Sequence, residues 1–314
     1  MLSITQIAYG GWQRCTQLST GALELVVTQE VGPRIIRCAL PGEANIFYEN
    51  PDMLGQTGGD TWRSYGGHRL WHAPESVPRT YYPDNTPVSI APLENLGVRM
   101  TQPTEPTTGI QKEIDLIPHP TEAAAWVAHR LTNRAAWPLE LAGWALSVMA
   151  PGGVSLLPLP PRGSHPHDLL PSSTLTLWPY TDLSDPRFRL GRHLVRLSQA
   201  STAALPQKIG VDGQVGWGAY WQDGLLFLKC YAHVPGGALR RPGLRAGGLH
   251  QCADAGTGDA RAATRLEPGQ SLEHVEYWSL HPGFELPAED DAALAGLGPL
   301  VEAGQAALLQ RPTA

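Results

Sequence analysis

The pattern of apolar and polar positions is that of β-strands over most of the chain. Short segments with two-residue periodicity, such as residues 34–40, 126–133 and 271–280, are separated by turns rich in Pro and Gly. Residues 139–149 are apolar on both faces, so we expect a central strand of a layered sheet. Only residues 288–310 have a helical pattern, which we expect Pro299 to divide. The pattern therefore predicts an all-β fold, a large antiparallel β-sandwich, followed by a short C-terminal helix.

The composition fits one domain of this kind. The chain has 314 residues, of which 42% are hydrophobic, and its 34 Gly and 29 Pro can supply many turns. No stretch resembles an interdomain linker, and no internal repeat is evident. We therefore expect residues 1–287 to form a single β-sandwich domain and residues 288–314 to form a helical tail.

Charge, cysteines and hydropathy limit the partners and the location. The formal net charge of −6 argues against a nucleic-acid partner. No apolar stretch is long enough to cross a bilayer, and residues 1–11 lack the pattern of a signal peptide, so we expect no membrane partner. Cys15, Cys38, Cys230 and Cys252 show no metal-binding spacing, so we expect reduced thiols, a cytoplasmic location, no metal and no cofactor. The oligomeric state stays open.

The densest group of functional side chains lies in residues 61–75, where two Trp, one Tyr, two His, two Arg and a Glu surround a Gly-Gly turn. Aromatic rings offer apolar faces, while Arg, His and Glu offer directed hydrogen bonds, a mixture that suits a polyol. We interpret the stretch as a ligand-site loop, followed by a Pro-rich loop that carries Tyr82. A surface loop pinned by its Trp residues is the alternative. The candidates in this stretch are His68, Arg69, Trp71, His72 and Glu75.

Later segments add further candidates. In residues 271–280 the face that carries Leu and Trp is expected to point inward, taking His274 and Glu276 with it as a possible acid/base pair. A satisfied polar pair near a sheet edge is the alternative. Lys208 is a candidate ligand-binding residue before an Ile-Gly turn. Lys229, Tyr231 and His233 share one face of residues 225–234, where they could line a groove.

Two segments have distinctive sequences: Tyr-Gly-Gly-His-Arg-Leu-Trp-His-Ala-Pro-Glu at 65–75 and Leu-Glu-Pro-Gly-Gln-Ser-Leu-Glu-His-Val-Glu-Tyr-Trp at 266–278. Both resemble segments of a bacterial subfamily of uncharacterised proteins with the galactose-mutarotase-like (aldose 1-epimerase-like) fold. Segments 32–37, 45–48, 177–187 and 208–210 add to the likeness, which covers residues 20–282. The resemblance implies a galactose-mutarotase-like β-supersandwich with a concave carbohydrate-binding face.

The resemblance also suggests a reaction. True mutarotases use a Glu as base on the anomeric hydroxyl and a His as acid on the ring oxygen, because ring opening needs proton removal and proton delivery together. The His-Gly-Gly segment of those enzymes is absent here, and residues 249–265 contain no Glu.

Two functions are therefore open. One is an isomerase that interconverts sugar anomers, with catalytic residues drawn from His72, Glu75, His274 and Glu276. The other is a non-catalytic carbohydrate-binding or sensing domain. Lyase or hydrolase chemistry is a weaker third idea. All of these imply a monosaccharide or sugar derivative as partner, and the sequence does not decide whether it is phosphorylated.

Overall fold

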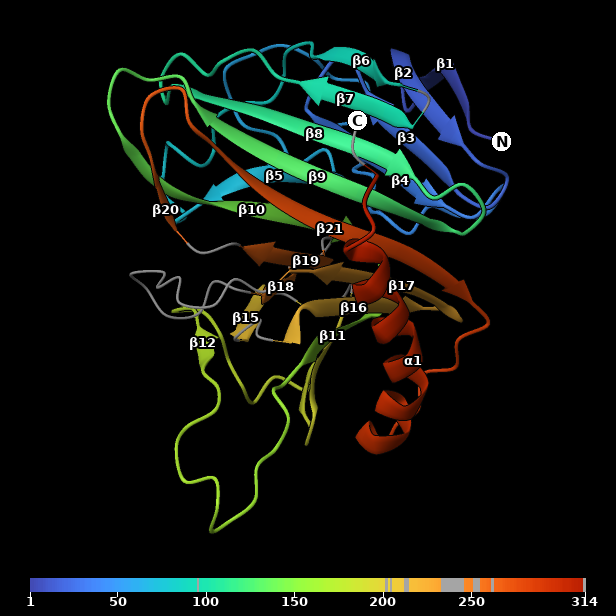
Figure 1. The fold of residues 1–314 in the computed structure, drawn as a ribbon, viewed down its shortest axis with the longest axis vertical. Helices are drawn as coiled ribbons and strands as arrows, with labels where there is room; N and C mark the ends of the chain where they lie inside the picture. Colours follow the sequence, from blue (N-terminus) through green and yellow to red (C-terminus); the bar gives the residue numbers. More distant parts are fainter. Residues whose placement is uncertain are drawn as a thin grey trace.

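The computed structural model describes residues 1–94, 96–200, 203, 205–211, 215–232, 246–250, 255–260 and 263–312. This part of the chain contains two large antiparallel sheets and one C-terminal helix (Figure 1). The predicted all-β sandwich with a short helix at its end is confirmed. The division into a domain at 1–287 and a tail at 288–314 stays a prediction.

The first sheet has eleven strands. Neighbouring strands run in the order β1 (Ser3–Tyr9), β2 (Trp12–Ser19), β3 (Glu24–Thr28), β4 (Arg34–Ala39), β5 (His68–Ala73), β10 (Leu139–Met149), β19 (Ala255–Ala260), β18 (Ala246–His250), β15 (Gln207–Val211) and β12 (Leu175–Leu177). The short strand β20 (Thr264–Leu266) pairs with the start of β10. As its sequence predicts, β10 is central: it lies between β5 and β19.

The second sheet has ten strands. Their order is β13 (Phe188–Leu190), β14 (Leu194–Ser198), β11 (Val154–Pro158), β16 (Trp217–Gln222), β17 (Leu225–Tyr231), β21 (Ser271–Pro282), β9 (Ala124–Asn133), β8 (Ile110–Pro118), β7 (Gly97–Thr101) and β6 (Ser89–Leu93). The long strands β9 and β21 pair over nine residues in a register that places His129 opposite His274. Both histidines therefore point to the same face of this sheet.

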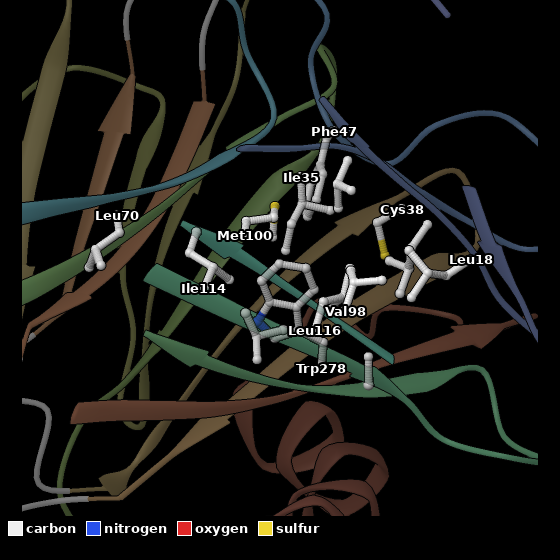
Figure 2. Close-up of a cluster of buried hydrophobic side chains, with 14 of the residues drawn as sticks. Leu18, Ile35, Cys38, Phe47, Leu70, Val98, Met100, Ile114, Leu116 and Trp278 are labelled. Carbon is white, nitrogen blue, oxygen red and sulfur yellow. The ribbon is translucent and has the colours of Figure 1, made fainter. Parts of the chain in front are cut away.

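The main core fills the space between the two sheets. Figure 2 shows part of it, with these labelled side chains: Leu18, Ile35, Cys38, Phe47, Leu70, Val98, Met100, Ile114, Leu116 and Trp278. The ring of Trp278 meets the ring of Phe47 edge-to-face at 5.5 Å between centroids. Burying each large apolar side chain contributes about 1.5–3 kcal/mol to stability. On every strand, the residues between these core positions must point away from this space.

The far face of the ten-stranded sheet is covered by α1 (Asp290–Leu308), which packs against β17 and β21 (Figure 1). The prediction that Pro299 divides this helix is wrong, because the helix is continuous through it. A proline inside a helix removes one hydrogen bond and costs about 3 kcal/mol. Here Leu297 and Val301, buried on either side of Pro299, hold both halves against the sheet.

The interpretation of residues 61–75 as a loop is wrong for its second half. Residues 68–73 form β5, whose six residues are all buried and which pairs with β4 and β10. The preceding Gly66 and Gly67 have φ angles of 93° and 67°. A Cβ atom at Gly66 would collide with the carbonyl of Tyr48, and one at Gly67 with the carbonyl of Ile35. The two glycines therefore let the chain pass close to its neighbours and enter the sheet.

Two smaller expectations can also be compared with the structure. Cys15, Cys38 and Cys230 are buried free thiols, as expected, and burial raises the pKa of each. Cys252 lies outside the described residues. Within the ranges given above, no helix combines the length and apolar character needed to span a membrane.

Candidate functional site

The candidate residues from β5 divide between two sides of the eleven-stranded sheet. Leu70 belongs to the core between the sheets, and His68 on the same face contacts His129 of the opposite sheet. Trp71 belongs to a separate cluster with Trp144 of β10, on the outer face. Since side chains alternate along a strand, Arg69 and Trp71 face outward, whereas His68 and His72 face inward.

The outer face carries an ion pair built from distant parts of the sequence. Glu75 follows β5, and Lys208 is on β15, two strands beyond β19 in the sheet order. Lys208 Nζ donates to Glu75 Oε2 at 3.0 Å, and the hydroxyl of Tyr81 donates to Glu75 Oε1. The side chain of Glu75 is 28% exposed and that of Lys208 is 4% exposed. The carboxylate is thus partly open to solvent while its lysine partner is shielded.

Aromatic rings surround both cations on this face. Lys208 Nζ lies 4.9 Å from the ring centroid of Trp144 and 4.3 Å from that of Trp178. The guanidinium carbon of Arg69 lies 4.8 Å from the ring of Trp62 and 4.3 Å from that of Trp71. Rings and cations at these separations attract each other. We refer to Trp62, Arg69, Trp71, Glu75, Tyr81, Trp144, Trp178 and Lys208 as the outer-face site.

Two effects shift the pKa values of the outer-face site: burial of its side chains and the negative charge of Glu75. Burial lowers the pKa of Lys208, an effect that the charge of Glu75 and its hydrogen bond oppose. Burial raises the pKa of Tyr81, and the hydrogen bond to Glu75 raises it further. Partial burial and the charge of Glu75 also raise the pKa of Tyr180. The site offers a carboxylate acceptor, an ammonium donor and several aromatic faces.

The second predicted pair, His274 and Glu276, lies between the sheets. The side chain of Glu276 is fully buried, and its carboxylate lies 3.2 Å from Lys229 Nζ. Trp278 Nε1 donates to Glu276 Oε2 at 2.6 Å, and His274 Nε2 lies 3.5 Å from Oε1. Burial alone would raise the pKa of Glu276, but the ammonium group of Lys229 and the hydrogen bond from His274 hold it well below its usual value. The expectation that this face points inward is confirmed.

His68 joins the same inter-sheet network through His129. His129 Nδ1 lies 3.1 Å from the carbonyl oxygen of His274, which can only accept, so Nδ1 carries the proton. His129 Nε2 then accepts from His68 Nε2 at 2.7 Å, and His68 Nδ1 accepts from the hydroxyl of Ser147 at 2.8 Å. Burial lowers the pKa of His129 to about 4 and that of His68 well below its usual value. Both rings are therefore neutral, as this chain of hydrogen bonds requires.

The ligand atoms of His68, His129 and Glu276 lie within 4.8 Å of one another, a spacing that could hold a metal ion. The chemistry of these groups does not fit one. The two Nε2 atoms share a hydrogen bond, and Lys229 already neutralises the carboxylate. A divalent cation would lie beside that ammonium group in a buried space, which electrostatic repulsion disfavours. We therefore interpret these residues as a hydrogen-bonded network.

The structure describes three further predicted residues, His72, Tyr82 and Tyr231. His72 is fully buried, its ring nitrogens have no hydrogen-bond partner among the described residues, and burial lowers its pKa to about 2. Tyr82 is half-buried, and burial followed by the charge of Glu105 raises its pKa. The ring of Tyr231 lies 6.3 Å from that of His274, between the sheets. His233 lies outside the described residues.

Comparison with known proteins gives a fold. No protein-family model matches the chain, and no curated protein matches it. Among solved structures, a galactose mutarotase-like protein from Lactobacillus casei matches with a TM-score of 0.53 and 9% identity, over 89% of this chain and all of that one. A galactose mutarotase-like protein from Clostridium acetobutylicum matches with a TM-score of 0.52 and 9% identity, over 90% and 99%. The chain has the galactose-mutarotase-like fold.

A third match shows that this fold also occurs within a longer protein. A TPR-domain containing protein from Parabacteroides distasonis matches with a TM-score of 0.55 and 13% identity, over 92% of this chain. This chain spans 56% of the length of that protein. At such identities the likeness establishes the galactose-mutarotase-like fold and leaves the activity open.

Within this galactose-mutarotase-like fold, the structure adds residues that the sequence analysis did not select. Trp62 and Tyr81 come from loops, Trp144 from β10 and Trp178 from the segment after β12. One signal in the sequence could have found Trp144, because it shares the outward face of its strand with Ala142 and Leu146. Its pairing with Trp71 depends on the register of β5 and β10, which only the structure gives.

Proposed function

We propose that the protein binds a monosaccharide or sugar derivative at the outer-face site. The observation that carries this proposal is the Glu75–Lys208 pair, held at 3.0 Å beside the rings of Trp144 and Trp178. Aromatic rings can stack on the C–H faces of a sugar, while the carboxylate and the ammonium group bond to its hydroxyls. The names of the solved galactose mutarotase-like proteins with this fold support a sugar as the ligand class.

We further propose that the protein interconverts sugar anomers, with Glu75 as the general base. A base must reach the anomeric hydroxyl, and Glu75 is 28% exposed, whereas Glu276 is fully buried. In this proposal Glu276 and His274 stabilise the space between the sheets and make no contact with the sugar.

The alternative is a non-catalytic carbohydrate-binding domain, and one observation favours it. Both oxygens of Glu75 already accept hydrogen bonds, one from Tyr81 and one from Lys208. A carboxylate that already accepts two hydrogen bonds is well suited to accept one more from a sugar hydroxyl without removing its proton. The two proposals share the site and the ligand class, and they differ only in whether the bound sugar reacts.

A screen for ligands followed by a rate measurement separates these proposals. Thermal shift against monosaccharides, uronic acids and sugar phosphates finds the ligand, and polarimetry on freshly dissolved α-anomers measures interconversion. We expect Glu75→Gln to bind the sugar and to lose about 10²–10⁴-fold in catalysed rate, the usual contribution of a general base. Glu267→Gln, which changes an exposed carboxylate paired with Arg265, serves as the matched control. A Glu75→Gln variant as active as the wild type would contradict the assignment of Glu75.

We also propose a cytoplasmic location and no nucleic-acid partner. The net charge of −6 supports the second point, because a phosphate backbone attracts basic surfaces. The free thiols of Cys15, Cys38 and Cys230 support the first, because proteins in oxidising compartments commonly form disulfides. Cell fractionation with an antibody to the protein tests the location, and a signal confined to an extracytoplasmic fraction would contradict it.

A further inference from the structure

The outer-face site contains a base but no histidine among the residues that the structure describes. The predicted histidines His68, His72 and His274 all lie on the inward side, within the space between the sheets. The hydrogen donors in contact with Glu75 are instead Tyr81 and Lys208. If the sugar ring opens at this site, these two groups are the candidates among the described residues for supplying the proton that the ring oxygen needs.

The geometry of sugar ring opening requires the acid and the base to be neighbours. The anomeric hydroxyl oxygen and the ring oxygen are bonded to the same carbon atom, so the base at one and the acid at the other stand close together. Lys208 Nζ and Glu75 Oε2 are 3.0 Å apart. An ammonium group has three N–H donors, and the hydrogen bond to Glu75 uses one of them. Among the described residues no other acceptor bonds to Nζ, so two N–H groups remain for a ligand that binds beside Glu75.

We propose that Lys208 is the catalytic acid that protonates the ring oxygen, an inference that rests on the proposed interconversion of anomers. Glu75 takes the proton of the anomeric hydroxyl, and a C=O double bond forms at the anomeric carbon. The bond from this carbon to the ring oxygen breaks, its electron pair goes to the ring oxygen, and Lys208 gives that oxygen a proton. After rotation of the aldehyde, neutral Lys208 takes the proton back, the ring closes, and Glu75 returns its proton to the new hydroxyl.

The surroundings of the two donors favour Lys208 over Tyr81. Burial lowers the pKa of Lys208, so its ammonium group gives up a proton more readily than an exposed lysine. Burial and Glu75 raise the pKa of Tyr81, so its hydroxyl is a weaker acid than an ordinary tyrosine. The rings of Trp144 and Trp178 restrict the position of the ammonium group. Tyr81 holds the other oxygen of Glu75 and thereby acts as a positioning residue.

Three variants at the site test this role. Lys208→Met removes the ammonium group and with it the transferable proton. Lys208→Arg keeps a positive charge, but on a guanidinium group that does not release its proton. Tyr81→Phe removes the competing donor. For each we would measure the dissociation constant of D-glucose and D-galactose by calorimetry and the catalysed interconversion of their α-anomers by polarimetry between pH 5 and pH 10.

We expect both Lys208 variants to lose at least about 10²-fold in catalysed rate, the scale of general acid catalysis. Lys208→Arg should retain sugar binding, and Tyr81→Phe should lose less than about tenfold in rate. The rate of the wild-type protein should fall at alkaline pH as Lys208 loses its proton, and the residual rate of Lys208→Met should lack this fall.

Each contrary outcome has a distinct meaning. A Lys208→Arg variant as active as the wild type would overturn the role of Lys208 and leave the proposed interconversion intact. Equal loss of binding and rate in Lys208→Arg would show that the lysine only binds the sugar, which also overturns the inference. A wild-type protein that binds both sugars and accelerates neither would overturn the interconversion together with its acid.

Discussion

The ion pair between the sheets supports a sharp stability prediction. Glu276→Gln keeps the shape of the side chain, and its oxygen can still accept from Trp278 Nε1, but it removes the charge opposite Lys229. Lys229 is 2% exposed and Glu276 is fully buried, so water cannot solvate the remaining ammonium group. Breaking a buried pair by removing one partner costs about 3–5 kcal/mol. For 314 residues, about 4 kcal/mol corresponds to a melting temperature lower by about 6 °C.

Urea unfolding followed by Trp fluorescence at pH 7 measures this effect. The exposed pair Arg265–Glu267, with side chains 68% and 52% exposed, supplies the matched control. Glu267→Gln should change the free energy of unfolding by less than about 1 kcal/mol, because solvent screens exposed pairs. The double variant Lys229→Met with Glu276→Gln should be more stable than Glu276→Gln alone, because it no longer buries an ammonium group beside a neutral amide.

A loss of less than about 1 kcal/mol in Glu276→Gln, the cost expected of an exposed pair, would refute this prediction. It is also refuted if the double variant is no more stable than the single one. Either result would mean that the ammonium group of Lys229 does not depend on this carboxylate for its stabilisation.

Two further predictions concern helix packing and pH. A Cβ at Gly304 would lie 2.7 Å from Cys230 Sγ, so Gly304→Ala should destabilise the protein by about 1–3 kcal/mol in urea unfolding. In the same helix, a Cβ at Gly296 would make only ordinary contact with the ring of Phe284, at 3.4 Å, so Gly296→Ala should stabilise the protein by up to about 1 kcal/mol. The pKa of His129 is lowered from 6.5 to about 4, so the unfolded state binds more protons and stability is lost as pH falls from about 6.5 to 4. The loss is about 3 kcal/mol by the usual conversion, and His129→Gln should show a smaller loss over this range.

Regular alternation is the part of the fold that the sequence predicts well. The strands at 124–133, 139–149 and 271–282 carry apolar side chains at every second position or on both faces, because they lie in the middle of their sheets. By contrast, β1 at 3–9 is an edge strand, exposed along most of its length, so its sequence carries no apolar face. The sequence analysis identified no strand there.

The composition of the outer-face site was only partly predictable. Arg69, Trp71, Glu75 and Lys208 were all selected from the sequence, but His68 and His72 were placed with them because residues 68–73 were interpreted as a loop. A strand sends neighbouring residues to opposite faces, so β5 separates the histidines from Arg69 and Trp71. The contact between Glu75 and Lys208 spans 133 residues and depends on the strand order β10-β19-β18-β15, which no local pattern contains.

The two candidate carboxylates show why residue type alone could not choose between them. Glu75 and Glu276 each pair with a lysine and each accept a hydrogen bond from an aromatic side chain, Tyr81 or Trp278. Their partners are of the same kind, but the side chain of Glu75 is 28% exposed and that of Glu276 is fully buried. Glu276 lies in the packed space between the two sheets, where a sugar cannot enter, so its ion pair can act only on stability. The Glu75–Lys208 pair lies on the outer face of its sheet, where the carboxylate can meet a ligand. The kinetic tests therefore concern Glu75 and Lys208, and the unfolding test concerns Glu276.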